Sequence, residues 1–358
     1  MTVWNFCPDY AQARRCFLER AAARGLEVQS HLHPLRGPAG EELAVDVVRI
    51  GPDDADRVLL TTSGVHGVEG HVGCGIQSAL LELDELSRTA DDRDTAVVHV
   101  HAVNPYGFAH VRRVTHENVD LNRNFIDFAQ PLPENPDYAP LEALLLPGEW
   151  PPRPEDEARL GERLAALGPR RAQLAITKGQ HTHPDGMYYG GQEPTWSHRI
   201  FRAVLRRHAG RCRRLAWIDL HSGLGPQGVG ERIFASHDTG AALQRARQWW
   251  GAGVTSVQAG DSTSIAMTGP IQNAVDVECP QAEYTGICLE FGTLPLPEMM
   301  LALRGEHWLH RHPQADPALA RRIRQALRDA FYVDTDAWKR QVLEQGLTCA
   351  RQALAGLR

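Results

Sequence analysis

The stretch RVLLTTSGVHGVEGH, residues 57–71, runs from an apolar segment into a glycine-rich turn that carries a histidine and a glutamate. Its first half, RVLLTTS, has the length and composition of a strand buried on both faces. After the turn, GCGIQSALLELDEL (73–86) places apolar residues three and four positions apart, which is typical of an amphipathic helix. The glycines let the chain turn sharply from strand to helix while His66 and Glu69 lie on the same side of the turn.

Apolar runs of strand length recur along the chain and alternate with amphipathic stretches such as 195–208 and 239–250. This alternation predicts an α/β fold, in which a mostly parallel, mixed and twisted sheet is flanked by helices on both faces. The further strands are expected at LAVDVVRI (43–50), AVVHVHAV (96–103), RLAWIDLHS (214–222), ERIFAS (231–236) and GICLEFG (286–292).

The length of 358 residues fits one large domain or two modest ones. Residues 131–154 hold eight of the 23 prolines, which predicts an exposed insertion, placed at 128–175. From 298 to 358 the pattern is helical, and we expect covering helices that begin at aspartate caps, Asp316 and Asp334. We therefore expect one domain over residues 1–358 with these two additions.

Composition and charge exclude several classes of protein. The net charge is −6 and the arginines are scattered through expected helices, so we expect no nucleic-acid partner. Neither a secretory start nor a run of eighteen apolar residues is present, so we expect no membrane association and a cytoplasmic location. The seven cysteines show no CxxC spacing, which indicates small buried hydrophobes in a reducing compartment. The sequence carries no signal for the oligomeric state.

Three of the expected strands end in charged or metal-capable side chains. His66 and Glu69 follow the first, His221 ends RLAWIDLHS, and Glu290 lies within GICLEFG. Open α/β sheets gather ligands at the carboxyl ends of their strands, so we expect these side chains to meet. Two imidazoles and a carboxylate are the ligands of a catalytic zinc that keeps one position open, and a further carboxylate serves as general base. Glu290 in its apolar run needs a partner or a shifted pKa.

A fourth segment, HAVNPYGFAHVRRVTHENVDLNRNF (101–125), adds Arg113, Asn122 and Arg123. The donor fork of an arginine suits a substrate carboxylate or a polarised carbonyl, and Asn122 adds a neutral amide. Asp219 lies two positions before His221, so both side chains point to the same side of a strand, and we expect Asp219 to orient an imidazole.

Taken in order, the motifs GVHGVEG, NPYGF, RRVTHENVDLNRNF, DLHSG and LEFGT resemble those of the zinc carboxypeptidase superfamily. The resemblance covers roughly residues 40–300 and is to a bacterial carboxypeptidase-like branch related to the succinylglutamate desuccinylase and aspartoacylase group. It implies a single carboxypeptidase-like catalytic domain with a phosphorylase/hydrolase-like fold.

The resemblance also implies roles for individual residues. One zinc per chain is expected to be bound by His66, Glu69 and His221, although such ligands also suit cobalt or nickel. Glu290 is expected to take a proton from the attacking water and to pass it to the leaving nitrogen. The arginine that steadies the oxyanion is expected to be Arg113, with Arg112 as the alternative. The terminal carboxylate of the substrate is expected to bind to Asn122 and Arg123.

The chain departs from the superfamily in one respect. In classical carboxypeptidases a mobile tyrosine lies about twenty residues before the base glutamate. The corresponding stretch here, STSIAMTGPIQNAV (262–275), contains no tyrosine, and Tyr284 is too close to Glu290. The segment KGQHTHPDGMYYGGQEPTWS (178–197) resembles a substrate-facing lid. Its His181 and His183 would form a second metal site only if the segment were extended, and no acid is spaced to join them.

These observations predict a zinc-dependent hydrolase that cleaves an amide or peptide bond next to a free carboxylate. The substrate is a small peptide or an N-acyl amino acid, and the sequence leaves the two open, together with side-chain specificity and pathway. The alternative from another class is a metal-free module that binds a carboxylate or a peptide. Such a module has no use for Glu290, which favours the enzyme.

Overall fold

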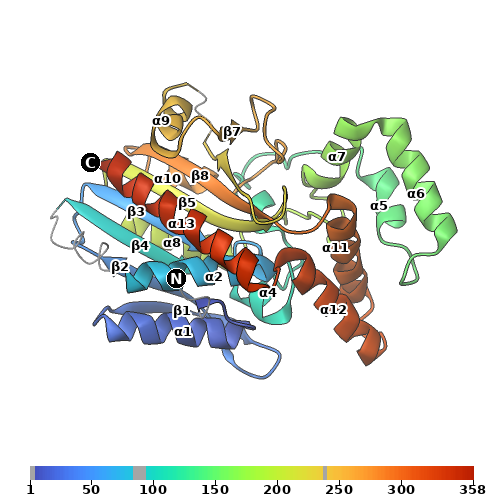
Figure 1. Cartoon of the computed structure of the whole chain (residues 1–358). Helices are drawn as coiled ribbons and strands as arrows, with labels where there is room; N and C mark the ends of the chain where they lie inside the picture. Colours follow the sequence, from blue (N-terminus) through green and yellow to red (C-terminus); the bar gives the residue numbers. More distant parts are fainter. Residues whose placement is uncertain (1–4, 84–93, 237–239) are drawn as a thin grey trace.

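The computed structural model describes residues 5–83, 94–236 and 240–358. Within these residues, the centre of the molecule is an eight-stranded sheet (Figure 1). In spatial order its strands are β1 (Val28–Arg36), β2 (Glu42–Ile50), β4 (Thr95–His101), β3 (Arg57–Ser63), β5 (Arg214–Gly223), β8 (Glu283–Gly292), β6 (Gly230–Phe234) and β7 (Val254–Ser256).

The sheet is mixed and mostly parallel, as predicted. Strands β4, β3, β5 and β8 run parallel in the middle, and β6 and β7 are also parallel to each other. The antiparallel pairs are β1 with β2, β2 with β4, and β6 with β8. The six expected strands are all present, whereas β1 and β7 at the two edges were not predicted.

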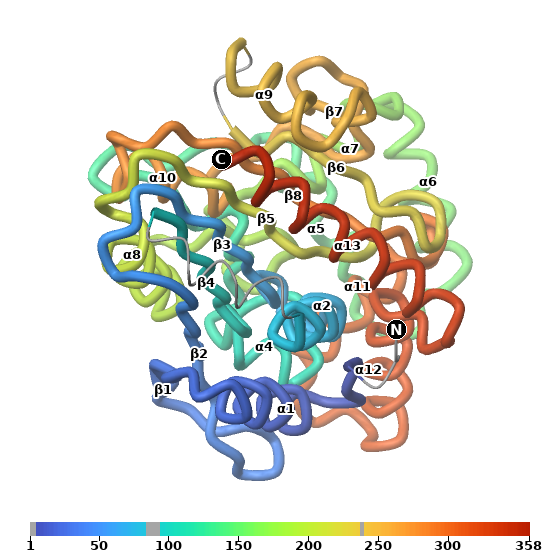
Figure 2. Tube along the Cα trace, turned by 60° about the vertical axis from the view of Figure 1, so that its left-hand side comes forward, coloured from blue at the N-terminus to red at the C-terminus, as the bar shows by residue number. Residues whose placement is uncertain are grey.

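Helices cover both faces of the sheet. One face packs against α2 (Gly70–Glu82), α9 (Ala241–Trp250) and α13 (Asp336–Leu357), and Figure 2 shows α13 lying across the sheet on the side of α2. The other face packs against α8 (Trp196–His208) and α10 (Asn273–Glu278). Along β5, Ile218 and Leu220 belong to the first core, and Leu215 and Trp217 to the second. Burial on both faces explains why the central strands read as continuous apolar runs.

Near the N-terminus, α1 (Tyr10–Ala23) packs against α2, and α4 (Pro105–His110) follows β4. Asp9 caps α1, since its side chain accepts a hydrogen bond from the Gln12 amide. Pro105 occupies the first turn of α4, and Asn104 caps it by accepting from the amide of Gly107.

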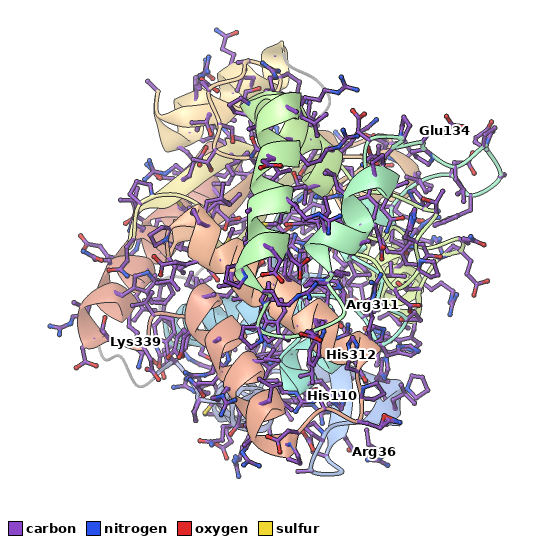
Figure 3. All side chains as sticks on the ribbon, turned by 90° about the vertical axis from the view of Figure 1, so that its right-hand side faces the viewer. Arg36, His110, Glu134, Arg311, His312 and Lys339 are labelled. Atoms are coloured by element: carbon purple, nitrogen blue, oxygen red, sulfur yellow. The ribbon has the colours of Figure 1, made fainter. Side chains whose placement is uncertain are left out.

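A second group of helices lies beside the sheet. The expected insertion contains α5 (Ala139–Leu145), α6 (Pro154–Leu167) and α7 (Pro169–Thr177), which share an apolar core with α11 (Leu296–Arg311) and α12 (Pro317–Phe331). Figure 3 looks onto this group, with Arg311 and His312 labelled at the end of α11. Of the three C-terminal helices, α13 covers the sheet, whereas α11 and α12 pack against the insertion.

The caps of the C-terminal helices match the expectation in part. Asp316 caps α12 and accepts hydrogen bonds from the amides of Ala318 and Leu319. The expected cap at Asp334 is wrong, because Thr335 caps α13 instead. The carboxylate of Asp334 pairs with Arg328 and Lys339, so it is held away from the helix end.

Across the described ranges, no helix combines the length and the apolar character that spanning a membrane requires. All seven cysteines are free thiols.

Two buried histidines on β4 should make the fold sensitive to acid. Burial lowers the pKa of His99 and of His101 to about 4, and within the described chain the Nε2 atom of each ring has no partner. Below the ordinary pKa of about 6.5, the unfolded chain takes up protons that the folded chain refuses, so stability falls as the pH drops towards 4. We expect each ring to remove about 2 kcal/mol of unfolding free energy between pH 7 and pH 5.

His101→Phe tests this expectation, since the His101 ring already stacks on Phe17 with ring centroids 4.8 Å apart. Denaturant titrations at pH 7 and pH 5 should show a smaller acid-induced loss of stability in the variant. An equal loss in both proteins would show that His101 is not a source of the acid sensitivity.

Candidate active site

The turn after β3 places His66 and Glu69 against the segment that carries Arg113. Gly64 adopts a φ of +62°, and residues Gly67–Glu69 form a single 3-10 turn, η2. The amide of Gly67 donates to the carbonyl of Arg113 at 3.0 Å. A Cβ atom at Gly67 would lie 2.1 Å from the carbonyl carbon of Gly107, so only glycine permits this close approach.

The three predicted metal ligands converge. The Nδ1 atom of His66 lies 2.9 Å from one Glu69 oxygen, and the Nδ1 atom of His221 lies 2.8 Å from the other. One ligand atom from each residue lies within 4.8 Å of the other two, and all three residues are buried. The carboxyl ends of β3 and β5 thus meet as expected, and the donor set is the one that a catalytic zinc takes.

The second nitrogen of each imidazole faces a carboxylate. Nε2 of His221 lies 2.8 Å from Asp219, in the geometry expected from the sequence, and Nε2 of His66 lies 3.2 Å from Asp120. Such carboxylates fix the orientation of a ligating ring. Asp120 was not singled out from the sequence, although its position before Asn122 marks it as a helix cap, and it accepts from the Asn122 amide at 3.0 Å.

Asp120 is fully buried and charged. Burial by itself would raise its pKa, but Arg113 and His66 outweigh burial and hold the pKa well below its usual range. Asp120 therefore stays ionised near neutral pH and can accept a hydrogen bond from the ring of His66.

We predict that Asp219→Asn weakens zinc affinity by about 10- to 100-fold, because His221 loses the charged acceptor that fixes its ring. The side chain of Gln272 donates to Asp219 at 3.0 Å, so Gln272→Ala is the control that keeps the carboxylate. Competition with a chromophoric chelator measures both affinities. Unchanged affinity in Asp219→Asn would show that Asp219 does not support a metal ligand.

Of the two neighbouring arginines, Arg113 lies at the site. Its Nε donates to Asp120 at 3.0 Å and its Nη1 to Glu69 at 3.2 Å, while Nη2 lies 2.8 Å from Nε2 of His66. Arg112 points away and pairs with Glu306, a buried carboxylate. The structure thus places Arg113 within reach of a group bound near His66 and Glu69.

Glu290 lies beside His221. The two residues are register partners on the parallel strands β8 and β5, so their side chains point to the same side of the sheet. One Glu290 oxygen accepts from the amide of Leu224 at 3.0 Å. Burial, reinforced by the nearby charge of Glu69, raises the pKa of Glu290 to about 8.

Arg123 and Asn122 line the same cavity as the residues above. Arg123 is 3% exposed, and it donates to the carbonyl oxygens of Thr177 and Asn122 at 3.0 and 2.9 Å. Its hydrogen bonds to described residues all go to uncharged acceptors. A buried cation in such surroundings attracts an anionic group. The side-chain oxygen of Asn122 accepts from the Ile271 amide at 3.1 Å.

Tyr188, in the expected lid segment, was not singled out from the sequence. Its ring lies between two guanidinium groups, with the carbons of Arg113 and Arg123 both 5.4 Å from its centroid. Its φ of 53° is in the left-handed region, which is unfavourable for a large side chain. Long-range packing therefore fixes its position, and a single sequence carries no signal for it.

The other candidates in the lid segment do not form a metal site. The Nδ1 atom of His181 lies 2.6 Å from the carbonyl oxygen of Gly191, and that of His183 lies 2.8 Å from the hydroxyl of Thr182. Within residues 5–83, 94–236 and 240–358, neither histidine belongs to a group of three metal-capable side chains.

A second metal-capable group overlaps the first and consists of His221, Cys288 and Glu290. This group lacks the second imidazole of the first group, and its Cys288 is only half-buried. The set of His66, Glu69 and His221 is therefore the better candidate.

A cavity of about 890 Å³ opens at these side chains. It is lined by all seven residues predicted for the site, namely His66, Glu69, Arg113, Asn122, Arg123, His221 and Glu290. Their placement in one cavity is a fact of the structure, whereas their individual roles stay predictions.

The chain is similar at low sequence identity to several solved structures, among them the following three. Carboxypeptidase A from Helicoverpa armigera shares 13% identity, over 99% of this chain and 75% of that one, with a TM-score of 0.49. Bovine thrombin-activatable fibrinolysis inhibitor shares 12% identity, over 90% and 96%, with a TM-score of 0.46. An aspartoacylase family protein from Mesorhizobium loti shares 14% identity, over 79% and 66%, with a TM-score of 0.38. No curated protein matches the chain.

One sequence family also matches most of the chain. The family described as "Protein of unknown function (DUF2817)" matches residues 6–345. The chain belongs to this family.

Proposed function

We propose that the chain is a zinc-dependent hydrolase that cleaves an amide or peptide bond next to a free carboxylate. The observation that carries the proposal is the convergence of His66, Glu69 and His221, with the carboxyl group of Glu290 beside them in the same cavity. A small peptide and an N-acyl amino acid both contain the required bond and carboxylate.

The residues present fit a zinc ion. Two imidazole Nδ1 atoms are directed at the two oxygens of one carboxylate, so His66, His221 and Glu69 would hold the ion between them. When bound, zinc polarises the scissile carbonyl and lowers the pKa of a water molecule to about 7.

The chain's own residues supply the rest of the reaction. Glu290 takes a proton from the attacking water and delivers it to the leaving nitrogen. Arg113 donates to the oxygen on which negative charge develops. Arg123 and Asn122 bind the substrate carboxylate and thereby position the bond to be cleaved.

Glu290 argues against a metal-free binding module. A module that only binds carboxylates has no step that needs a proton acceptor, so it gains nothing from a buried carboxyl group beside Glu69. A hydrolase requires such a group.

A panel of short peptides and N-acyl amino acids, with and without a chelator, tests the proposal. We expect release of the carboxyl-terminal residue or of the free amino acid, loss of this activity with the chelator, and recovery with zinc. Full activity in the metal-stripped protein, or binding without any cleavage, would contradict the proposal.

A further inference from the structure

The cavity continues beyond the candidate catalytic residues between helices of the insertion and α11. We call this part the helical arm, and Figure 1 shows α6 and α7 beside α11 at the right of the sheet. Its walls are apolar side chains from three helices, namely Leu160, Leu164, Ala172, Ile176, Met299 and Leu303. Leu296 and Leu301 of α11 also line the cavity and are 48% and 44% exposed, so apolar surface extends to its mouth.

The helical arm begins next to the candidate metal ligands. The hydroxyl of Tyr188, whose ring contacts Arg113, lies 3.7 Å from the sulfur of Met300 on α11. A Cβ atom at Gly223, two residues after His221, would lie 3.0 Å from the sulfur of Met299. A substrate whose scissile bond lies at His66 and His221 therefore has direct access to the arm.

The cationic side chains of the cavity lie near the candidate catalytic residues. Arg113 contacts His66 and Glu69, and Arg123 donates to the carbonyl oxygen of Thr177, where α7 ends. In the wall of the arm, Arg304 and Glu157 neutralise each other, since Arg304 donates to both oxygens of Glu157 at 3.0 and 2.6 Å, and the carboxylate of Glu298 lies at the exposed mouth. A molecule that matches this distribution has an anionic group at one end and a hydrocarbon segment at the other.

The walls of the arm also distinguish a hydrocarbon chain from a peptide. In α6, α7 and α11 the backbone amides and carbonyls are paired within each helix, so the walls offer no strand edge to an extended peptide. Peptide groups placed there would lose their hydrogen bonds to water without replacement. An acyl chain has no polar group beyond its carbonyl.

We propose that the substrate is an N-acyl amino acid with a long hydrocarbon acyl chain. The chain lies in the helical arm, and Arg123 binds the carboxylate. The whole cavity, of which the arm is one part, has a volume of about 890 Å³, so it leaves room beyond an acetyl or succinyl group. This inference rests on the proposed function, because it assigns the scissile amide to the candidate metal site.

Binding can be measured apart from turnover. Calorimetry on the full-length Glu290→Gln variant with zinc compares N-decanoylglycine with N-acetylglycine. Each methylene that is buried strengthens binding about fourfold, so burial of even half of the added chain predicts at least about a 100-fold difference in Kd.

Gly161 on α6 provides the variant that fills the arm. It lines the cavity, and a Cβ atom there would have no heavy atom within 4 Å, so the side chain of Gly161→Trp starts in open space. Gly161→Ala is the matched control with little added volume. We expect Gly161→Trp to lower the affinity ratio of the decanoyl to the acetyl ligand at least tenfold, and Gly161→Ala to retain the ratio. Leu164→Gln places an amide in the wall of the arm and should also lower the affinity ratio of the decanoyl to the acetyl ligand.

The outcomes separate this inference from the proposed function. Equal affinity for the two ligands, or an unchanged ratio in both Gly161→Trp and Leu164→Gln, would overturn the helical arm as an acyl site. So would tighter binding of the tripeptide Leu-Leu-Gly than of N-decanoylglycine. If long-chain ligands bind in the arm but the wild-type protein with zinc cleaves none of them, the inference on binding holds and the hydrolase proposal fails. If the protein cleaves acetyl and decanoyl substrates with equal kcat/KM, the hydrolase proposal holds and the inference on the helical arm fails.

Discussion

Glu290→Gln is expected to lower kcat/KM by about 10²- to 10³-fold or more while the protein keeps its zinc. The amide is nearly isosteric with the carboxyl group but cannot accept the proton of the attacking water. Burial raises the pKa of Glu290 from 4.5 to about 8, so between these two pH values the unfolded chain releases a proton that the folded chain keeps, and stability falls as the pH rises across this range. The variant should therefore be at least as stable as the wild type at pH 9.

Steady-state kinetics, metal analysis and denaturant titration measure the three effects. The control is Glu298→Gln, which removes the same charge from an exposed residue at the mouth of the cavity. Full activity of Glu290→Gln would remove Glu290 from the mechanism. Loss of zinc along with activity would instead place Glu290 among the metal ligands.

Arg113→Ala is expected to reduce kcat/KM by about 10²- to 10³-fold, because a donor to the developing oxyanion is lost. The same change leaves the buried carboxylates of Asp120 and Glu69 without their guanidinium partner. Breaking a buried ion pair in this way should lower the free energy of unfolding by about 3–5 kcal/mol.

The neighbouring Arg112→Ala separates these two effects. It also removes a guanidinium from a buried carboxylate, Glu306, and should destabilise the fold to a similar extent. Its folded fraction should nevertheless retain normal kcat/KM. If Arg112→Ala loses turnover and Arg113→Ala does not, the assignment of the two arginines is reversed.

The central strands could be predicted because burial on both faces makes them continuous apolar runs. Strand β1 lacks this signal, since it lies at the edge of the sheet, contains Pro34, and leaves Leu32 56% exposed. Strand β7 has only three residues, too few for any period to be read. The sequence thus predicted the buried middle of the sheet better than its edges.

The site shows the same division between local and long-range information. His66, Glu69 and His221 could be predicted because the first two follow β3 and the third lies near the end of β5, each within a recognisable motif. His221 and Glu290 lie side by side because of the register between β5 and β8. No local sequence pattern encodes this register. The positions of Asp120 and Tyr188 and the helical arm depend on contacts between distant segments, so they required the structure.

The most direct test of the central claim is the zinc content of the protein purified without chelator, compared with that of His221→Ala. We predict about one zinc per chain in the wild type, and a tenfold or greater loss in the variant, because three protein ligands hold a catalytic zinc. A wild-type protein that takes up no zinc, or a His221→Ala variant that keeps the full amount, would contradict a metal centre at His66, Glu69 and His221.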